Sequence, residues 1–103
     1  MSAAPLTEAE LEQLKAQFEA KAEEVKVLPK APSNEVKLQL YGLFKQSKVG
    51  NNTTPKPGML DFKGKAMWEA WTAQKDKEPA KAMDEYIKLV EKLQEEAKAE
   101  AAE

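Results

Sequence analysis

The segment SNEVKLQLYGLFKQSKVG, residues 33–50, decides the fold because its apolar residues recur at helical spacing on two neighbouring faces. Ser33 or Asn34 can cap the start of this helix, and Gly50 is suited to its end. One face, expected to pack in the core, carries Val36, Leu40, Leu43 and Ser47. The adjacent face, which runs from an aliphatic residue to lysine, carries Leu38, Tyr41, Lys45 and Lys48. Such a face suits a ligand that is apolar at one end and anionic at the other. The alternative is a set of lysines that extend over core aromatics to reach water.

Three further helices are expected around this segment. Thr7 and Glu10 form a capping box for the first helix, which has apolar residues at steps of three and four as far as Leu28. Residues 50–60, GNNTTPKPGML, are typical of a loop. Asp61 is a suitable cap for a third helix that reaches about residue 75, and Pro79 suits the first position of a fourth. The alanine-rich tail at 95–103 is expected to fray. No segment has the period of a strand, so the chain is predicted to be all-α, with a single four-helix domain over residues 1–103.

The composition excludes most familiar kinds of active site. The 103 residues contain no histidine and no cysteine, so there is no imidazole base, no thiolate nucleophile and no soft metal ligand. Aspartate and glutamate at helical spacing are typical of solvated faces rather than catalytic pairs. We therefore expect a protein that is not an enzyme, with no cofactor and no bound metal.

Positive charge is concentrated in one part of the chain. Between residues 41 and 68 five lysines face a single acid, Asp61, which gives this segment a charge of +4 in a chain whose net charge is −2. This pattern favours a compact polyanion over nucleic acid, because the acidic remainder would repel phosphates beyond the patch. Chance clustering of solvated lysines is the alternative. No secretory signal or membrane span is evident, so a cytoplasmic monomer without stable membrane insertion is expected.

Four blocks of the sequence resemble the acyl-CoA-binding protein family in order and spacing over about residues 18–93. These blocks are Pro32-Ser33, YGLFKQSKVG at 41–50, KPGMLDFKGKAMWEAW at 56–71, and Tyr86-Ile87. The resemblance implies a four-helix bundle of up-down-down-up topology. It also implies non-catalytic intracellular binding, buffering and transport of long-chain fatty acyl-CoA esters, with acyl-CoA-using enzymes as partners.

The resemblance also implies roles for individual residues. Tyr41 would lie beside the adenine, Lys45 on the 3′-phosphate, and Tyr86 near the same nucleotide. The remaining ligand-binding positions would be the rim residues of the first helix, one residue near the acyl chain, one near the phosphates and two on the third helix: Phe18, Ala22, Lys26, Leu38, Lys63, Met67 and Trp68. Trp71 is expected to pack.

Two positions depart from the family pattern. Met67 stands where the family usually has a lysine that clamps the 3′-phosphate, and Phe44 stands where tyrosine is common. Lys63 and Lys65 are expected at different angles from Met67 around the third helix. Two alternatives to a carrier are a helical module that binds another protein and an enzyme that transforms acyl-CoA. The second alternative would need a catalytic group and a further domain.

Overall fold

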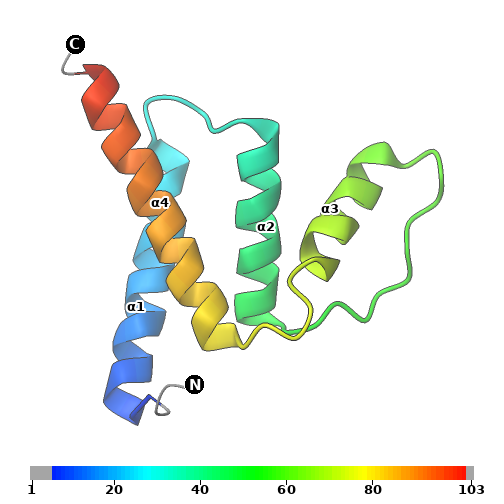
Figure 1. The fold of residues 1–103 in the computed structure, drawn as a ribbon, viewed down its shortest axis with the longest axis horizontal. Helices are drawn as coiled ribbons and strands as arrows, with labels where there is room; N and C mark the ends of the chain where they lie inside the picture. The colour runs from blue at the N-terminus through cyan, green and yellow to red at the C-terminus, as the bar shows by residue number, and fades with distance from the viewer. Residues whose placement is uncertain (1–5, 102–103) are drawn as a thin grey trace.

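The computed structural model describes residues 6–101, which form four α-helices and one turn of 3₁₀-helix with no strand. The elements are α1 (Glu8–Glu24), η1 (Val25–Val27), α2 (Asn34–Lys48), α3 (Phe62–Thr72) and α4 (Pro79–Ala101). Figure 1 shows that α1 and α4 run in one direction while α2 and α3 run in the other. The all-α class and the up-down-down-up topology implied by the resemblance are therefore confirmed.

The helix starts lie where the capping residues predict them. Thr7 and Glu10 form the reciprocal capping box of α1. The Ser33 hydroxyl accepts a hydrogen bond from the Val36 N–H at the start of α2, and the Asp61 carboxylate accepts one from the Gly64 N–H at the start of α3. Each cap satisfies a backbone donor that has no partner inside its helix.

Two helix ends differ from the expectation. Helix α3 stops at Thr72, three residues early, because the chain turns through residues 73–76 and Asp76 adopts a positive φ of 68°. Helix α4 continues to Ala101, so the described part of its tail is helical rather than frayed. Alanine, glutamate and lysine are strong helix formers, and Lys30 Nζ lies 3.7 Å from the Glu100 carboxylate near this end.

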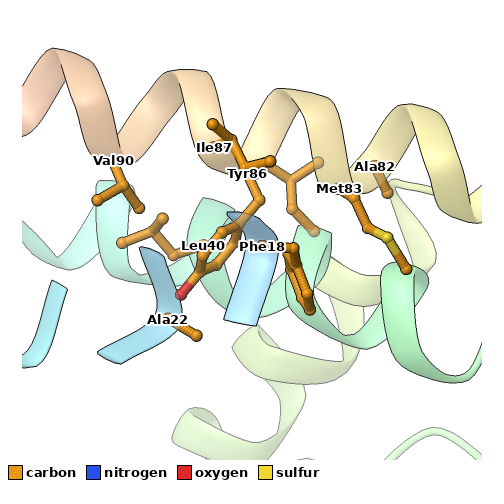
Figure 2. Close-up of a cluster of buried hydrophobic side chains, with 9 residues drawn as sticks. Phe18, Ala22, Leu40, Ala82, Met83, Tyr86, Ile87 and Val90 are labelled. Carbon is orange, nitrogen blue, oxygen red and sulfur yellow. The ribbon is translucent and has the colours of Figure 1, made fainter. Parts of the chain in front are cut away.

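The core lies between α1, α2 and α4. Phe18 and Val90 are fully buried at its centre. Figure 2 shows how side chains of α4 meet those of α1 and α2 in this cluster. The other buried members of the cluster are Ala22, Leu40, Leu43, Ala82, Met83, Tyr86 and Ile87. The bundle is thus built mainly on three helices.

Helix α3 stands outside this core and packs mainly against α2 (Figure 1). A Cβ built on Gly42 of α2 would lie only 2.4 Å from the Ala70 carbonyl oxygen of α3, so the two backbones touch where no side chain fits. The buried Trp71 indole N–H donates to the Gly50 carbonyl at 2.8 Å, and the Asn52 amide donates to the Thr72 hydroxyl at 3.1 Å. These contacts fix α3 against α2, and Trp71 packs as expected.

Replacement of Gly42 by alanine should separate α2 from α3. The added methyl meets a backbone carbonyl that cannot rotate away, so we expect Gly42→Ala to lower the free energy of unfolding by about 1–3 kcal/mol, although alanine is the better helix former. Gly58→Ala is the matched control, because a Cβ on Gly58 has no neighbour within 4 Å. Urea denaturation measures both. Equal stability of Gly42→Ala and the wild type would contradict this close approach.

A second polar contact holds the start of α4. The Lys77 ammonium donates to the Glu85 carboxylate at 2.6 Å and to the Gln74 amide oxygen at 2.7 Å. The hydrogen bond from Lys77 lowers the pKa of Glu85 below its ordinary value of 4.5, with Lys81 adding a smaller contribution and partial burial opposing both. The Lys77–Glu85 contact thus ties the α3–α4 connection to the second turn of α4.

The stability that Glu85 adds should depend on pH. Because its pKa is lowered in the folded state, the contribution is present above pH 4.5 and is lost as the pH falls through the folded value. Glu85→Gln should cost less than about 1 kcal/mol at pH 7, since the pair is partly solvated, and its cost should shrink in acid. Thermal melts of Glu85→Gln and of Glu96→Gln, on the exposed side of α4, measure this. A cost for Glu85→Gln that does not change with pH would refute the assignment.

Candidate functional site

Two adjoining hollows lie between α2 and α3, on the side of α2 that carries Leu38 and Tyr41. The first has a volume of about 470 Å³ and is lined by Asn34, Lys37, Leu38, Tyr41, Lys63, Ala66 and Met67. The second has a volume of about 280 Å³ and is lined by Tyr41, Thr54, Pro55, Pro57, Gly64, Met67, Trp68 and Trp71. Tyr41 and Met67 line both hollows, so we treat them as one feature, the α2–α3 trough.

The narrower hollow of the trough is lined by three aromatic rings, and two lysines lie over its tryptophans. Lys45 Nζ lies 4.8 Å from the centroid of the Trp71 ring, and Lys56 Nζ lies 5.8 Å from that of Trp68. The Trp68 indole N–H donates to the Thr54 carbonyl at 2.9 Å, which fixes the ring against the loop before α3. Lysines over ring faces are attracted by the ring quadrupole, so Lys45 and Lys56 lie beside this end of the trough although neither lines it.

The wider hollow has both apolar side chains and lysines in its lining. Leu38, Ala66 and Met67 supply aliphatic and thioether surface from both helices. Lys37 stands on α2 and Lys63 on α3, both exposed to solvent. A groove of this kind can take an apolar chain along its floor and an anionic group at its edge.

A separate aromatic cluster lies on the α1 side of α2. The Phe18 ring stacks on Phe44 with centroids 5.5 Å apart and meets Tyr86 edge-on at 5.0 Å. Lys48 Nζ lies 5.9 Å from the centroids of both Phe18 and Phe44. Burial raises the pKa of the Tyr86 hydroxyl, so this group is neutral at physiological pH. Because the Phe44 ring contacts Phe18 and Tyr86 on one side and lies near Lys48 on the other, it connects the outer face of α2 to the core.

The structure brings together six of the ten residues that the sequence identifies as ligand-binding. Five line the trough and the sixth, Lys45, stands over the Trp71 ring beside it: Leu38, Tyr41, Lys63, Met67, Trp68 and Lys45. Phe18, Ala22 and Tyr86 are buried in the core instead. Lys26 is exposed in η1 at the end of α1 and pairs with Glu23 at 3.0 Å. The roles of these four residues stay predictions.

One geometric expectation is wrong. Lys63 was expected at a different angle from Met67, but both line the same hollow. Residues four apart lie on one face of an α-helix, so the Lys63 ammonium can reach the space beside the Met67 side chain. Lys63 and Met67 therefore share one face of α3.

Sequence reasoning missed several lining residues. The wider hollow also includes Asn34, Lys37 and Ala66, and the narrower one includes the loop residues Thr54, Pro55 and Pro57. Helical spacing offered a signal for two of them, since Lys37 precedes Tyr41 by four residues and Ala66 follows Lys63 by three. The loop offered no such signal, because its position depends on the contact between Thr54 and Trp68.

A larger open hollow lies elsewhere, between the end of α1 and the second half of α4. It has a volume of about 790 Å³ and is lined by Lys21, Glu24, Val27, Leu28, Pro29, Glu91, Gln94, Glu95, Ala97, Lys98 and Ala101. Three glutamates against two lysines, and no aromatic ring, make it a poor match for an anionic ligand. Size alone does not identify a site, and the α2–α3 trough has the more specific chemistry.

No helix within residues 6–101 is both long enough and apolar enough to cross a membrane. In the same part of the chain, no group of three or more acidic, histidine or cysteine side chains is arranged to hold a metal ion.

Comparisons with known proteins agree on one family. Residues 15–90 match the family model described as "Acyl CoA binding protein". The chain is 60% identical over 77 residues to the acyl-CoA-binding protein homolog of Drosophila melanogaster, covering 75% of this chain and 90% of that protein. It is 49% identical over 86 residues to acyl-CoA-binding domain-containing protein 3 of Oryza sativa subsp. japonica, covering 84% of this chain and 56% of that longer relative. The crystal structure of Oryza sativa acyl-CoA-binding protein 2 superimposes with a TM-score of 0.80 at 48% identity, covering 84% of this chain and 96% of that one.

Proposed function

The chain belongs to the acyl-CoA-binding protein family, and from that premise we propose that it binds long-chain fatty acyl-CoA esters and carries them without transforming them. The observation that carries the proposal is the chemistry of the α2–α3 trough. Its wider hollow has both apolar side chains and two lysines, Lys37 and Lys63, and its narrower hollow is lined by three aromatic rings, with Lys45 over one of them. An acyl-CoA ester likewise combines an apolar hydrocarbon chain with an aromatic base and anionic phosphates.

The two ends of the ligand would contribute in different ways. Burying about eight methylenes of the chain against Leu38, Ala66 and Met67 supplies about 6 kcal/mol before ordering costs. Each lysine–phosphate contact adds roughly 1.5–3 kcal/mol as a charge-assisted hydrogen bond. Burial of the acyl chain would thus supply much of the affinity, and the lysine–phosphate contacts much of the selectivity against uncharged lipids.

We propose that Tyr41 stacks beside the adenine, that Lys45 pairs with the 3′-phosphate and that Lys63 pairs with the remaining phosphates. Support comes from Tyr41 lining both hollows and from Lys63 standing at the rim of the wider one. Trp68 would close the narrower hollow over the nucleotide. Met67 would contribute soft apolar contact in place of the lysine that is usual in the family.

The four predicted residues outside the trough would support the site or extend its rim. They are Phe18, Ala22, Lys26 and Tyr86. Phe18 and Tyr86 pack against the Phe44 ring from the core side. They would therefore support the outer face of α2 that meets the nucleotide rather than contact the ligand themselves. Lys26, exposed near the end of α1, would add a cation at the far rim.

The wider physiological role forms a further part of the proposal. We propose that the chain acts as a single-domain cytoplasmic monomer that buffers and transports its ligand and delivers it to enzymes that use acyl-CoA. A carrier needs no catalytic group, in keeping with a sequence that has no histidine and no cysteine. Incubation with palmitoyl-CoA followed by mass analysis of the thioester tests whether any turnover occurs.

Calorimetry with parts of the ligand tests the central proposal. Palmitoyl-CoA should bind at least about a hundredfold more tightly than either free CoA or palmitate, because each fragment lacks the contacts of one end of the trough. Equal affinities for palmitate and palmitoyl-CoA would remove the nucleotide from the proposal. The absence of saturable heat with palmitoyl-CoA would instead favour a module that binds another protein.

Removal of the Lys45 ammonium should weaken binding selectively. Lys45→Ala should lower the affinity for palmitoyl-CoA about ten- to hundredfold, equivalent to about 1.5–3 kcal/mol. The loss should be smaller for the ester of dephospho-CoA, which lacks the 3′-phosphate. Lys88→Ala, on the exposed face of α4, is the matched control. Lys45 also contacts the Trp71 ring, so the free energy of unfolding of Lys45→Ala must be measured as well. It is expected to fall by about 0.5–1 kcal/mol. Equal losses for both esters would show that Lys45 does not contact the 3′-phosphate.

A further inference from the structure

Three large apolar side chains stand exposed on the connection between α2 and α3. Met59, Leu60 and Phe62 have exposed fractions of 83%, 88% and 74%. The Asp61 N–H donates to the Gly58 carbonyl at 3.0 Å, so Met59 and Leu60 are the two central residues of a tight turn. We call Met59, Leu60 and Phe62 the apolar tip. In Figure 1 the segment that carries it lies at the edge of the molecule, on the far side of α2 from α1.

The apolar tip is unusual for a turn. The centres of turns are normally occupied by glycine, proline, asparagine, aspartate or serine, because those residues suit the backbone and the solvent. The other exposed large apolar residues, Leu6, Val27 and Val49, occur singly along the chain, which is common on protein surfaces. Three such side chains within four residues, with no packing role in the described structure, indicate an apolar surface outside the chain.

The tip is also held in place. The Asp61 carboxylate caps α3, which fixes the turn to the helix that follows it. Pro55 and Pro57 restrict the backbone before the turn, and the Trp68 indole holds the Thr54 carbonyl. An apolar apex that is ordered in advance loses little conformational entropy on contact with a partner.

Lysines flank the tip along the chain. Lys56 precedes it, and Lys63 and Lys65 follow it on the first turn of α3. Asp61 is the only acid between residues 56 and 68, and its carboxylate already accepts the Gly64 N–H. An exposed apolar turn flanked by lysines along the chain matches the surface of an anionic bilayer, where headgroups attract lysines and the acyl boundary accepts apolar side chains.

We propose that the apolar tip inserts into the interfacial region of an anionic lipid bilayer while Lys56, Lys63 and Lys65 contact the headgroups. Lys63 directly follows Phe62 and lines the wider hollow of the trough, so docking brings that hollow to the membrane surface. There it can take up or release an amphiphile whose acyl chain lies in the bilayer. This use of the docking rests on the proposed function, whereas the docking itself does not.

Sedimentation with vesicles tests the docking on the full chain without ligand. The bound fraction should be at least about fivefold higher on vesicles of phosphatidylcholine with 30% phosphatidylserine than on pure phosphatidylcholine, and it should fall as salt is added. Leu60→Ser should reduce partitioning about five- to tenfold. Val27→Ser is the matched control, since Val27 is 79% exposed in η1, far along the chain from the tip. Both side chains are exposed, so unfolding midpoints should not change.

Several outcomes would overturn the docking proposal. No binding to the anionic vesicles would show that the tip contacts something other than a bilayer, such as another protein. Equal partitioning of Leu60→Ser and the wild type would show that the apolar tip does not insert. Equal binding of the wild type to neutral and anionic vesicles would show that the lysines do not contact the headgroups. Calorimetry with soluble decanoyl-CoA separates the two proposals, because Leu60→Ser should keep the wild-type affinity. Failure of the wild type to bind both this ester and palmitoyl-CoA would refute the proposed function and leave the vesicle result standing.

Discussion

The close approach of α2 and α3 at Gly42 and the Ala70 carbonyl is the constraint on which the trough depends. Any side chain at position 42 would push the two backbones apart. Because the helices touch at this point, their side chains on the exposed side meet at a fixed separation, and Tyr41 from α2 and Met67 from α3 line the same hollows. The Trp71 and Asn52 hydrogen bonds then prevent α3 from sliding along that contact. Gly42 thus sets the separation of the two helices that form the trough, although Gly42 itself lines neither hollow.

Local signals in the sequence predicted most of the fold. Helix starts followed from Thr7, Ser33, Asp61 and Pro79, because capping is a short-range interaction between a side chain and the next turn. The end of α3 did not follow, since Asp76 has a positive φ that no local pattern of glycine or asparagine announced. The direction of the helices came from the family resemblance alone. Helical spacing cannot state which way a chain returns across a long loop such as that at 50–60.

The candidate site was predictable to the extent that it lies on one helix face. Leu38, Tyr41 and Lys45 were identified together because their spacing places them side by side on α2. Positions that depend on a second element were harder. The proximity of Thr54 to Trp68 and the burial of Phe18 under Phe44 are tertiary contacts, which no periodicity encodes. Phe44 was noticed only as a departure from the family, although its ring joins the face of α2 to the core.

The peripheral position of α3 has a consequence for the lifetime of any bound molecule. Helices α1, α2 and α4 share the buried cluster, whereas α3 is attached mainly to α2 and to the loop before it. The free energy needed to detach α3 is therefore smaller than the free energy needed to dissolve the three-helix core. One wall of the groove can swing open while the remainder of the protein stays folded. Exchange of any molecule held in the trough would then require only this local opening, and its rate would be independent of the much slower global unfolding.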